Sequence, residues 1–191
     1  MNKLNILVVG VGGQGVVTLA RLLSEACYEC GLNVLMSETR GLSQRGGSVK
    51  VFLRIGRVYA PTFNNADLLI GLELLETLRN ISYVSDKTVI VVNNKLLSPG
   101  NMAYTTSRKK IIEILKLRAK KLEVINAEEL ALKLGNVKSE NMVMLGYISS
   151  HSMFERIRHC IENVFYKSKY SKIRENVKAF EQGKKLKPIL Y

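Results

Sequence analysis

Residues 5–30 read NILVVGVGGQGVVTLARLLSEACYEC, and this stretch decides the fold class. The apolar run Asn5–Val9 is typical of a strand that is buried on both faces. Glycines follow it, and apolar residues then recur with helical spacing over Val16–Cys30, up to a helix end that we expect at Gly31. Asn33–Ser37 is a second strand pattern, so the chain opens with a β-strand, a glycine turn, a helix and a strand, the βαβ crossover unit.

The next segment predicts a change of strand direction. Thr39–Gly47 has nine residues, three of them glycine, and no helical periodicity. Ser48–Arg57 then alternates apolar and polar residues, as a strand does. A parallel connection needs a crossover of about a dozen residues or more, usually a helix. We therefore expect this strand to run antiparallel to part of the sheet, which makes the sheet mixed.

The rest of the chain continues the alternation of strands and helices. We expect strands at Ala66–Gly71, Thr88–Val92 and Leu122–Ile125, and helices at Glu73–Asn80, Ser107–Lys121, Glu128–Leu134, Ser139–Ser149 and twice within Met153–Lys185. The prediction is an α/β fold, a three-layer Rossmann-like domain with a mixed, mostly parallel sheet and a helical C-terminal segment. We expect one domain over residues 1–191, with the helical third at about 139–187 packed on it.

Composition narrows the function classes. The chain has 191 residues, 29 basic against 16 acidic, and a formal charge of +13. Exposed aromatics interleaved with basic residues, or a known nucleic-acid module, are not found, so we expect no nucleic-acid partner, although a basic binding module stays open. The uncharged run Leu4–Ala20 is too short and glycine-rich for a membrane span or a signal peptide, so we expect a cytoplasmic protein without a membrane partner.

The first glycine motif fits the G-x-G-x-x-G pattern at Gly10–Gly15, and Glu38 follows at the distance of a ribose-binding acid. Such a turn lets a phosphate approach the backbone and the helix N-terminus. Three interpretations stay open: an anion or substrate loop, an NAD(P) site, or a purely structural turn. Under the first, the candidate site residues are Gly12, Gly13, Gln14 and Gly15.

A second donor-rich loop supplies the remaining candidates, which are Ser43, Gln44, Arg45, Gly46 and Gly47. An arginine beside two glycines combines a fork of donors with accessible backbone N–H groups. This loop should lie at the same edge of the sheet as the first, where ligands bind in open α/β folds. The alternative is an ordinary turn with a solvated arginine.

Cysteine and histidine spacing predicts no metal centre. Cys27 and Cys30 form a C-x-x-C pair at the end of a helix, whereas a redox pair follows a strand and starts a helix. Cys160 is the third and last cysteine, too few for a four-thiolate cluster. We expect buried structural cysteines, and we expect His151 and His159 to be ordinary surface or core residues.

The motifs together resemble a known family, the gamma-type domain of 2-oxoacid:ferredoxin oxidoreductases. GGQG followed about thirty residues later by SQRGG is specific, and it resembles most the beta subunits of the indolepyruvate type. Thr39-Arg40 departs from the pair usual in that family, so the substrate stays open. The segments that fit are Gly10–Gly15, Ser37–Ser48, Ala66–Arg79, Thr88–Asn93, Asn141–Gly146 and Asn176–Gly183.

The resemblance implies a role in oxidative decarboxylation of a 2-oxoacid on thiamine diphosphate, with acyl transfer to coenzyme A and reduction of ferredoxin. It implies that thiamine diphosphate, Mg²⁺ and [4Fe–4S] clusters sit on a larger alpha subunit. The expected role of this chain is a partner without cofactors or catalytic residues of its own, inactive alone, whose two glycine loops shape the active-site wall or face coenzyme A. Alternatives are an NAD(P)-dependent Rossmann-type oxidoreductase, or a subunit for pyruvate, a branched-chain 2-oxoacid or 2-oxoglutarate.

Overall fold

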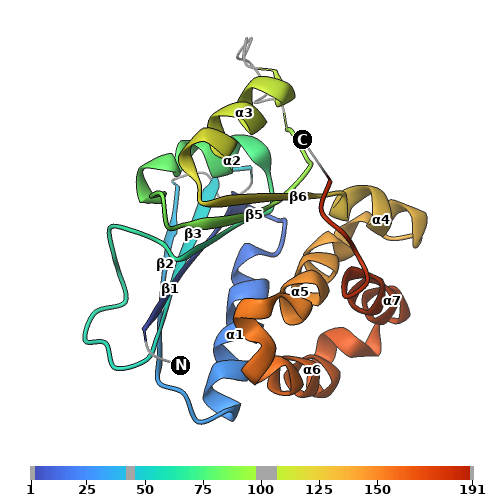
Figure 1. Ribbon diagram of the computed structural model, residues 1–191. Helices are drawn as coiled ribbons and strands as arrows, with labels where there is room; N and C mark the ends of the chain where they lie inside the picture. Colours follow the sequence, from blue (N-terminus) through green and yellow to red (C-terminus); the bar gives the residue numbers. More distant parts are fainter. Residues whose placement is uncertain (1–2, 42–45, 98–106, 190–191) are drawn as a thin grey trace.

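A six-stranded sheet forms the centre of the computed structural model, which describes residues 3–41, 46–97 and 107–189. The order of the strands across the sheet is β2-β3-β1-β4-β5-β6 (Figure 1). The strands are β1 (Leu4–Val11), β2 (Val34–Arg40), β3 (Ser48–Ile55), β4 (Leu68–Gly71), β5 (Val89–Asn93) and β6 (Lys121–Ile125).

The expected reversal is found at β3. It pairs antiparallel with both β1 and β2, whereas β1, β4, β5 and β6 pair in parallel. The first crossover therefore links two parallel strands, β1 and β2, that are not neighbours, because β3 lies between them. The predicted mixed, mostly parallel sheet is confirmed.

Helices cover both faces of the sheet, which confirms the three layers (Figure 1). Ile6 and Val8 of β1 point into the core with the N-terminal and C-terminal helices, while Leu7 and Val9 point into the core on the other face. The first group of helices contains α1 (Val16–Glu29), α4 (Ala127–Lys133), α5 (Glu140–Ser150), α6 (Arg158–Lys167) and α7 (Arg174–Gly183); the other face carries α2 (Leu74–Arg79) and α3 (Arg108–Arg118). Short 3₁₀ turns are η1 (Ile81–Tyr83), η2 (Val137–Ser139), η3 (Ser152–Ile157) and η4 (Lys169–Lys172).

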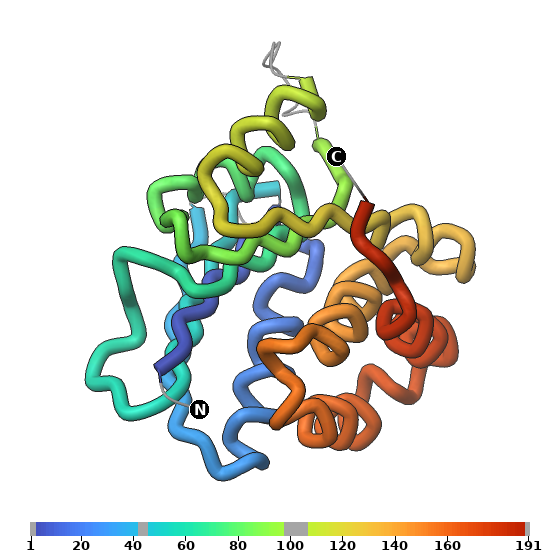
Figure 2. Tube along the Cα trace, in the orientation of Figure 1, coloured from blue at the N-terminus to red at the C-terminus, as the bar shows by residue number. Residues whose placement is uncertain are grey.

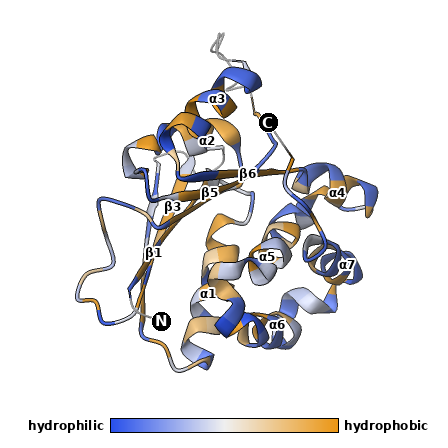
Figure 3. Ribbon diagram, in the orientation of Figure 1, coloured by the Kyte–Doolittle hydropathy of each residue, from blue (hydrophilic) through white to orange (hydrophobic). Residues whose placement is uncertain are grey.

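Hydropathy follows this layering (Figure 3), with apolar strands between helices whose outer faces are polar. Helix α5 differs because all of its residues except Ser150 are buried. It lies between the sheet-side helix α1 and the outer helix α7, so no face of it meets water (Figure 1). A helix that is enclosed on every side needs no polar stripe.

Two glycines let α5 and α7 approach at backbone distance. A Cβ built on Gly146 would lie 2.1 Å from the carbonyl oxygen of Phe180, and one built on Gly183 would lie 2.2 Å from that of Val143. The contact is reciprocal, since each helix supplies a glycine against the backbone of the other. The segments NMVMLG and NVKAFEQG therefore meet in space through their glycines.

The C-terminal segment returns to the sheet beside β6 (Figure 2). Ile189 donates its backbone N–H to the carbonyl oxygen of Val124 at 2.8 Å, in an antiparallel bridge. This contact lies at the β6 edge of the sheet, while β2 forms the opposite edge.

Boundaries differ from the sequence expectation at several elements, and the cause is clear at two of them. Thr39 and Arg40 belong to β2 rather than to a loop, because they pair with Lys50 and Val49 of β3. Helix α2 begins one residue later than expected, since the carboxylate of Glu73 accepts the N–H of Glu76 at 2.6 Å and caps the helix. Within the described residues, no helix combines the length and the apolar character that a membrane span requires.

Candidate functional site

The two glycine loops meet at the carboxyl edge of the sheet. The N–H of Gly12, which follows β1, donates to the carbonyl oxygen of Gly47 at 2.8 Å. The predicted juxtaposition of the loops is thereby confirmed at Gly47, which directly precedes β3. The candidates Ser43, Gln44 and Arg45 lie outside the described residues.

The first glycine loop, Gly10–Gly15, has glycine at two positions where the backbone conformation requires it. Gly13 has φ 101° and Gly15 has φ 80°, both in the region that favours glycine over other residues. Gly15 is the N-cap of α1 and has no side chain to bond the N–H groups of the first turn. The turn therefore presents backbone donors at the positive end of a 14-residue helix.

A pocket of about 610 Å³ opens at this turn. Its described wall combines the glycine loop, the start of α1 and the ends of β2 and β3. The residues that line it are Val11, Gly12, Gly13, Gly15, Val16, Val17, Thr18, Arg40, Gly41 and Val49. Backbone donors and a guanidinium in one pocket are suited to an anionic ligand.

Arg40 is the charged group of that wall. Its guanidinium lies 3.1 Å from the carboxylate of Glu38, and the two side chains are 62% and 39% exposed. An ion pair so exposed contributes little to folding, so Arg40 is available to a ligand at small cost. Glu38 thus pairs with Arg40 at the outer strand of the sheet, two strands away from β1.

Gln14 turns away from the pocket that the described residues line. Its Oε1 accepts the N–H of Val11 at 2.7 Å, and its Nε2 donates to the carbonyl oxygen of Leu72 at 3.2 Å and to Glu140 Oε1 at 3.3 Å. The side chain therefore joins the glycine turn to the end of β4 and to α5. The sequence grouped Gln14 with the wall glycines because spacing alone does not show which way a loop side chain turns.

A charge cluster, composed of Lys95, Glu128 and Glu140, lies behind the loop, with Glu140 buried and Glu128 35% exposed. Lys95 Nζ is 2.8 Å from Glu128 Oε1 and 3.0 Å from Glu140 Oε2, and its side chain is 11% exposed. Burial raises the pKa of Glu140 above its usual value, although hydrogen bonding to Lys95 opposes the shift. Burial acts to lower the pKa of Lys95, but its hydrogen bonds to Glu128 and Glu140 outweigh this and raise it.

The charge cluster fixes α4 and α5 against the strand ends. Asn93, the last residue of β5, accepts the N–H of Ala127 at 3.0 Å and thereby holds the first turn of α4. Sequence reasoning missed these residues because Lys95, Glu128 and Glu140 lie on separate segments and match no motif. Asn93-Asn94 at the end of an apolar strand was the available signal.

We expect the two positive-φ glycines of the turn to differ in cost. A Cβ on Gly13 would meet nothing within 4 Å, so Gly13→Ala brings only backbone strain of about 1–2 kcal/mol. A Cβ on Gly15 would lie 2.2 Å from Nδ2 of Asn141, which is 6% exposed. Gly15→Ala should therefore cost about 1–2 kcal/mol more, as overpacking typically does. Denaturant unfolding of both variants measures the difference, and equal costs would contradict the structure.

A second buried acid, Glu123 on β6, anchors the end of α5. Tyr147 donates its hydroxyl to Glu123 Oε2 at 2.8 Å, Lys121 Nζ lies 2.6 Å from Oε1, and His151 Nε2 lies 3.4 Å from Oε2. Burial acts to raise the pKa of Glu123, but hydrogen bonds from His151, Lys121 and Tyr147 outweigh it and lower the pKa to about 2. His151, with its side chain 10% exposed, is thus a largely buried residue with a structural contact to Glu123.

The lowered pKa of Glu123 predicts an acid-dependent contribution to stability. A carboxylate whose pKa falls on folding stabilises the folded protein at pH values above the pKa that the group has in the unfolded chain. That contribution is lost as the pH drops through the pKa that the group has in the folded protein. The shift in the pKa of Glu123 from 4.5 to about 2 corresponds to roughly 3 kcal/mol of folding free energy. We expect Glu123→Gln to destabilise the chain at pH 7, and the gap to the wild type to shrink between pH 5 and pH 2. Urea unfolding over that range tests it, and a constant gap would contradict it.

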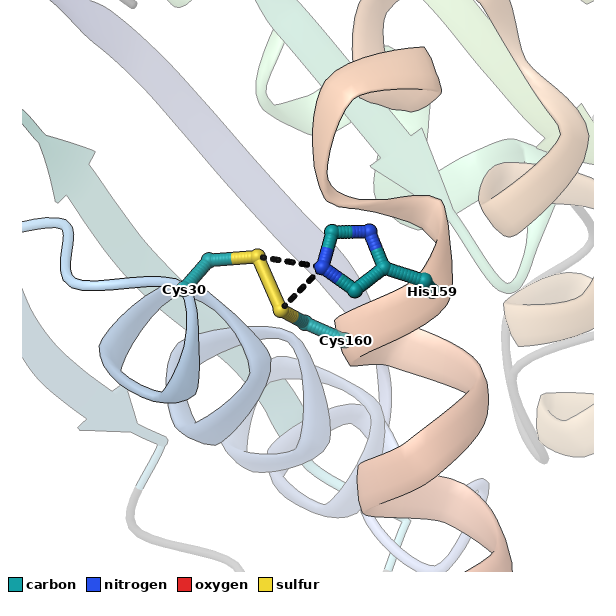
Figure 4. Close-up of side chains that lie close together, drawn as sticks. All are labelled: Cys30, His159 and Cys160. Atoms are coloured by element: carbon teal, nitrogen blue, oxygen red, sulfur yellow. Dashed lines mark hydrogen bonds between the residues drawn. A yellow bond between two sulfur atoms is a disulfide. The ribbon is translucent and has the colours of Figure 1, made fainter.

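The cysteines correct the sequence expectation. Cys27 is buried, as predicted; its thiol is free, and burial raises the pKa of that thiol to about 12. Cys30 and Cys160, in contrast, form a disulfide across 130 positions, joining the end of α1 to the first turn of α6 (Figure 4). The ring of His159 points at both sulfurs. Sequence could not pair them, because only the packing of α1 on α6 brings the thiols together.

Comparison with known proteins places these features in a family. Residues 5–186 match the family described as "Pyruvate ferredoxin/flavodoxin oxidoreductase". A relative from Archaeoglobus fulgidus, "Indolepyruvate oxidoreductase subunit IorB", is 37% identical over 95% of this chain and 94% of its own length.

Solved structures share the fold. The pyruvate oxidoreductase subunit PORC of Thermotoga maritima superposes with a TM-score of 0.68 at 21% identity, covering 97% of both chains. A 2-oxoglutarate:ferredoxin oxidoreductase from Magnetococcus marinus, with 2-oxoglutarate, coenzyme A and succinyl-CoA bound, gives a TM-score of 0.72 at 20% identity. That match covers 97% of this chain and 31% of the other, so this chain spans about a third of it. Because the family match extends over residues 5–186 and the Archaeoglobus fulgidus relative aligns over nearly the whole of both chains, the chain belongs to the pyruvate ferredoxin/flavodoxin oxidoreductase family and is similar to subunits of 2-oxoacid:ferredoxin oxidoreductases.

Proposed function

We propose that this chain is the subunit without cofactors of an indolepyruvate-type 2-oxoacid:ferredoxin oxidoreductase. The complete enzyme would decarboxylate an aryl pyruvate oxidatively, form the acyl-CoA and reduce ferredoxin in the cytoplasm. Similarity to the Archaeoglobus fulgidus subunit over nearly the whole length of both chains supports the choice of substrate class. We propose that the chain forms one domain and that its role is to complete the complex.

The contact from Gly12 to Gly47 is the observation that carries the proposal. This hydrogen bond holds the two candidate loops together at one edge of the sheet, beside a pocket that is lined by Arg40 and the start of α1. Coenzyme A carries several phosphate charges, and backbone donors with a guanidinium suit them. The bound coenzyme A of the Magnetococcus marinus enzyme supports this ligand class. We propose that the pocket forms part of the active-site wall, facing coenzyme A or the larger subunit.

Thiamine diphosphate, Mg²⁺ and [4Fe–4S] clusters are proposed to reside on the larger alpha subunit. When bound there, they would supply carbanion stabilisation and electron transfer. Three cysteines cannot ligate a four-thiolate cluster, and two of them are joined to one another. The described residues of this chain therefore contribute position and charge, and the chain should have no activity alone.

The NAD(P) alternative fits the strand order poorly. In dinucleotide-binding sheets β2 lies next to β1, and its terminal acid reaches the ribose. Here β3 separates them, and Glu38 pairs with Arg40 at the outer strand. A thermal-shift titration tests the alternative, since NAD(H) at 100 times its dissociation constant would stabilise the chain by ~2.7 kcal/mol.

Reconstitution tests the proposal directly. The chain should co-purify with a large thiamine-enzyme-like subunit, and ferredoxin reduction should require both. Indolepyruvate should be turned over faster than pyruvate, a branched-chain 2-oxoacid or 2-oxoglutarate. A preference for another 2-oxoacid would correct the substrate alone, whereas failure to assemble would overturn the proposal.

Gly13→Val probes the wall in the same assay. Its side chain would enter open space and extend toward whatever faces the loop. Weaker assembly or a higher KM for substrate is the expected result. A lower Tm with normal assembly and kinetics would mean that the loop is only a structural turn.

A further inference from the structure

Three reactive groups gather where the end of α1 meets the start of α6. They are Cys30, His159 and Cys160, and their Sγ and Nε2 atoms all lie within 4.8 Å of one another. His159 Nε2 is 3.7 Å from Cys30 Sγ and 3.3 Å from Cys160 Sγ (Figure 4). The two helices are also joined by the ion pair of Glu29 with Lys167, at 3.0 Å. The cluster lies at the opposite end of α1 from the glycine-loop pocket, which the first residues of that helix line.

The two sulfurs differ in accessibility. Cys30 is half-buried at the C-cap of α1, whereas Cys160 is 3% exposed within α6. His159 is exposed and sits over the bond between them. A reagent from solvent therefore reaches Cys30 first and leaves Cys160 for a second, internal step. Cys27, one helical turn before Cys30, is fully buried and takes no part in the cluster.

We propose that Cys30, Cys160 and His159 form a reversible thiol–disulfide exchange site on this subunit, which low-molecular-weight disulfides oxidise and low-molecular-weight thiols reduce. Cys30 is the entry thiol and Cys160 the resolving thiol. His159 accepts the proton from each thiol in turn and returns it to the leaving sulfur. The proposal concerns a modification site and is independent of the substrate of the complex.

The exchange balances in two steps. The thiolate of Cys30 attacks one sulfur of a small disulfide, forming a mixed disulfide and releasing one small thiolate. The thiolate of Cys160 then attacks the Cys30 sulfur, which forms the internal disulfide and releases the second small thiolate. The two protein thiols lose two electrons and two protons, and the small disulfide gains them. Reduction follows the same steps in reverse.

The contact of His159 with both sulfurs distinguishes this site from a disulfide with a purely structural role. Exchange requires the thiolate, and a base in contact with the sulfur supplies it. Cross-linking residues 130 positions apart also restricts the unfolded chain, so the two redox states should differ in thermal stability. The site thus couples a redox signal to the packing of α1 on α6.

The full chain should be equilibrated with defined ratios of reduced and oxidised glutathione, quenched with acid and alkylated. The mass of the intact chain is then measured by mass spectrometry. We expect reversible loss of two hydrogens, located between Cys30 and Cys160 by peptide mapping, and a higher Tm for the oxidised form. Cys160→Ser should trap one glutathionyl group on Cys30. Cys27→Ala is the matched control and should cross-link as the wild type does. His159→Gln should slow exchange by about tenfold or more without changing the final ratio.

Each contrary result overturns the proposal. Alkylation of both thiols at every glutathione ratio would mean that no disulfide forms. A cross-link that resists reduction in the folded chain would be a permanent staple. An unchanged rate in His159→Gln would remove the histidine from the chemistry. A stoichiometric metal ion that stays on the reduced chain and blocks cross-linking would assign the three groups to metal binding.

Discussion

Gly146→Ala should lower the free energy of unfolding by more than about 3 kcal/mol. Intrinsic propensity predicts the opposite sign, because alanine in a helix interior is favoured over glycine by about 1 kcal/mol. The added Cβ would lie 2.1 Å from the carbonyl oxygen of Phe180, a backbone atom that cannot rotate aside. Helices α5 and α7 would have to separate, and the core that they share with α1 would open with them. Urea unfolding decides the sign.

Two further variants test the origin of that loss. Ser150→Ala changes the same helix without adding a Cβ, so its effect should stay within about 0.5 kcal/mol. Gly183→Ala should cost as much as Gly146→Ala, since its Cβ would lie 2.2 Å from the carbonyl oxygen of Val143. The double variant should cost less than the sum, because one separation of the helices relieves both clashes. A higher Tm in either single variant would refute the close crossing.

Arg40→Ala should reduce kcat/KM of the reconstituted complex at least tenfold while leaving the folding of the chain almost unchanged. Its guanidinium is the charged group of the described pocket wall, and ~1.4 kcal/mol of lost transition-state binding is already tenfold. Its ion pair with Glu38 is exposed, so removal should cost about 0–1 kcal/mol of stability. Steady-state kinetics with coenzyme A as the varied substrate measures the effect.

Arg21→Ala is the matched control for this prediction. It removes the same charge from an exposed position on α1 that does not line the pocket, so kcat/KM should not change. Arg45→Ala, from the loop outside the described residues, should lower activity as Arg40→Ala does if both arginines face the same anion. Equal kinetics in Arg40→Ala, Arg21→Ala and the wild type would reject the pocket as a functional wall.

Local pattern was sufficient where one segment sets its own structure. The alternation in Ser48–Arg57 gave β3, and the shortness of the preceding linker gave its direction, because a parallel return needs a crossover. The glycine turn before α1 was equally readable, since Gly13 and Gly15 adopt positive φ. The predicted strand at Asn33–Ser37 ended too early. Thr39 and Arg40 also belong to β2, because pairing with β3 and not local propensity sets the end of that strand.

The sequence by itself therefore determined the layers, the reversed strand and the meeting of the two glycine loops. Only the tertiary structure decided how distant segments pair. It turned Gln14 inward to Glu140, seated Lys95 between two acids, brought Gly146 against α7 and joined Cys30 to Cys160. The physical reason is that hydrophobic periodicity specifies which face of an element is buried, but not what it is buried against. Those contacts depend on how each helix docks on the sheet.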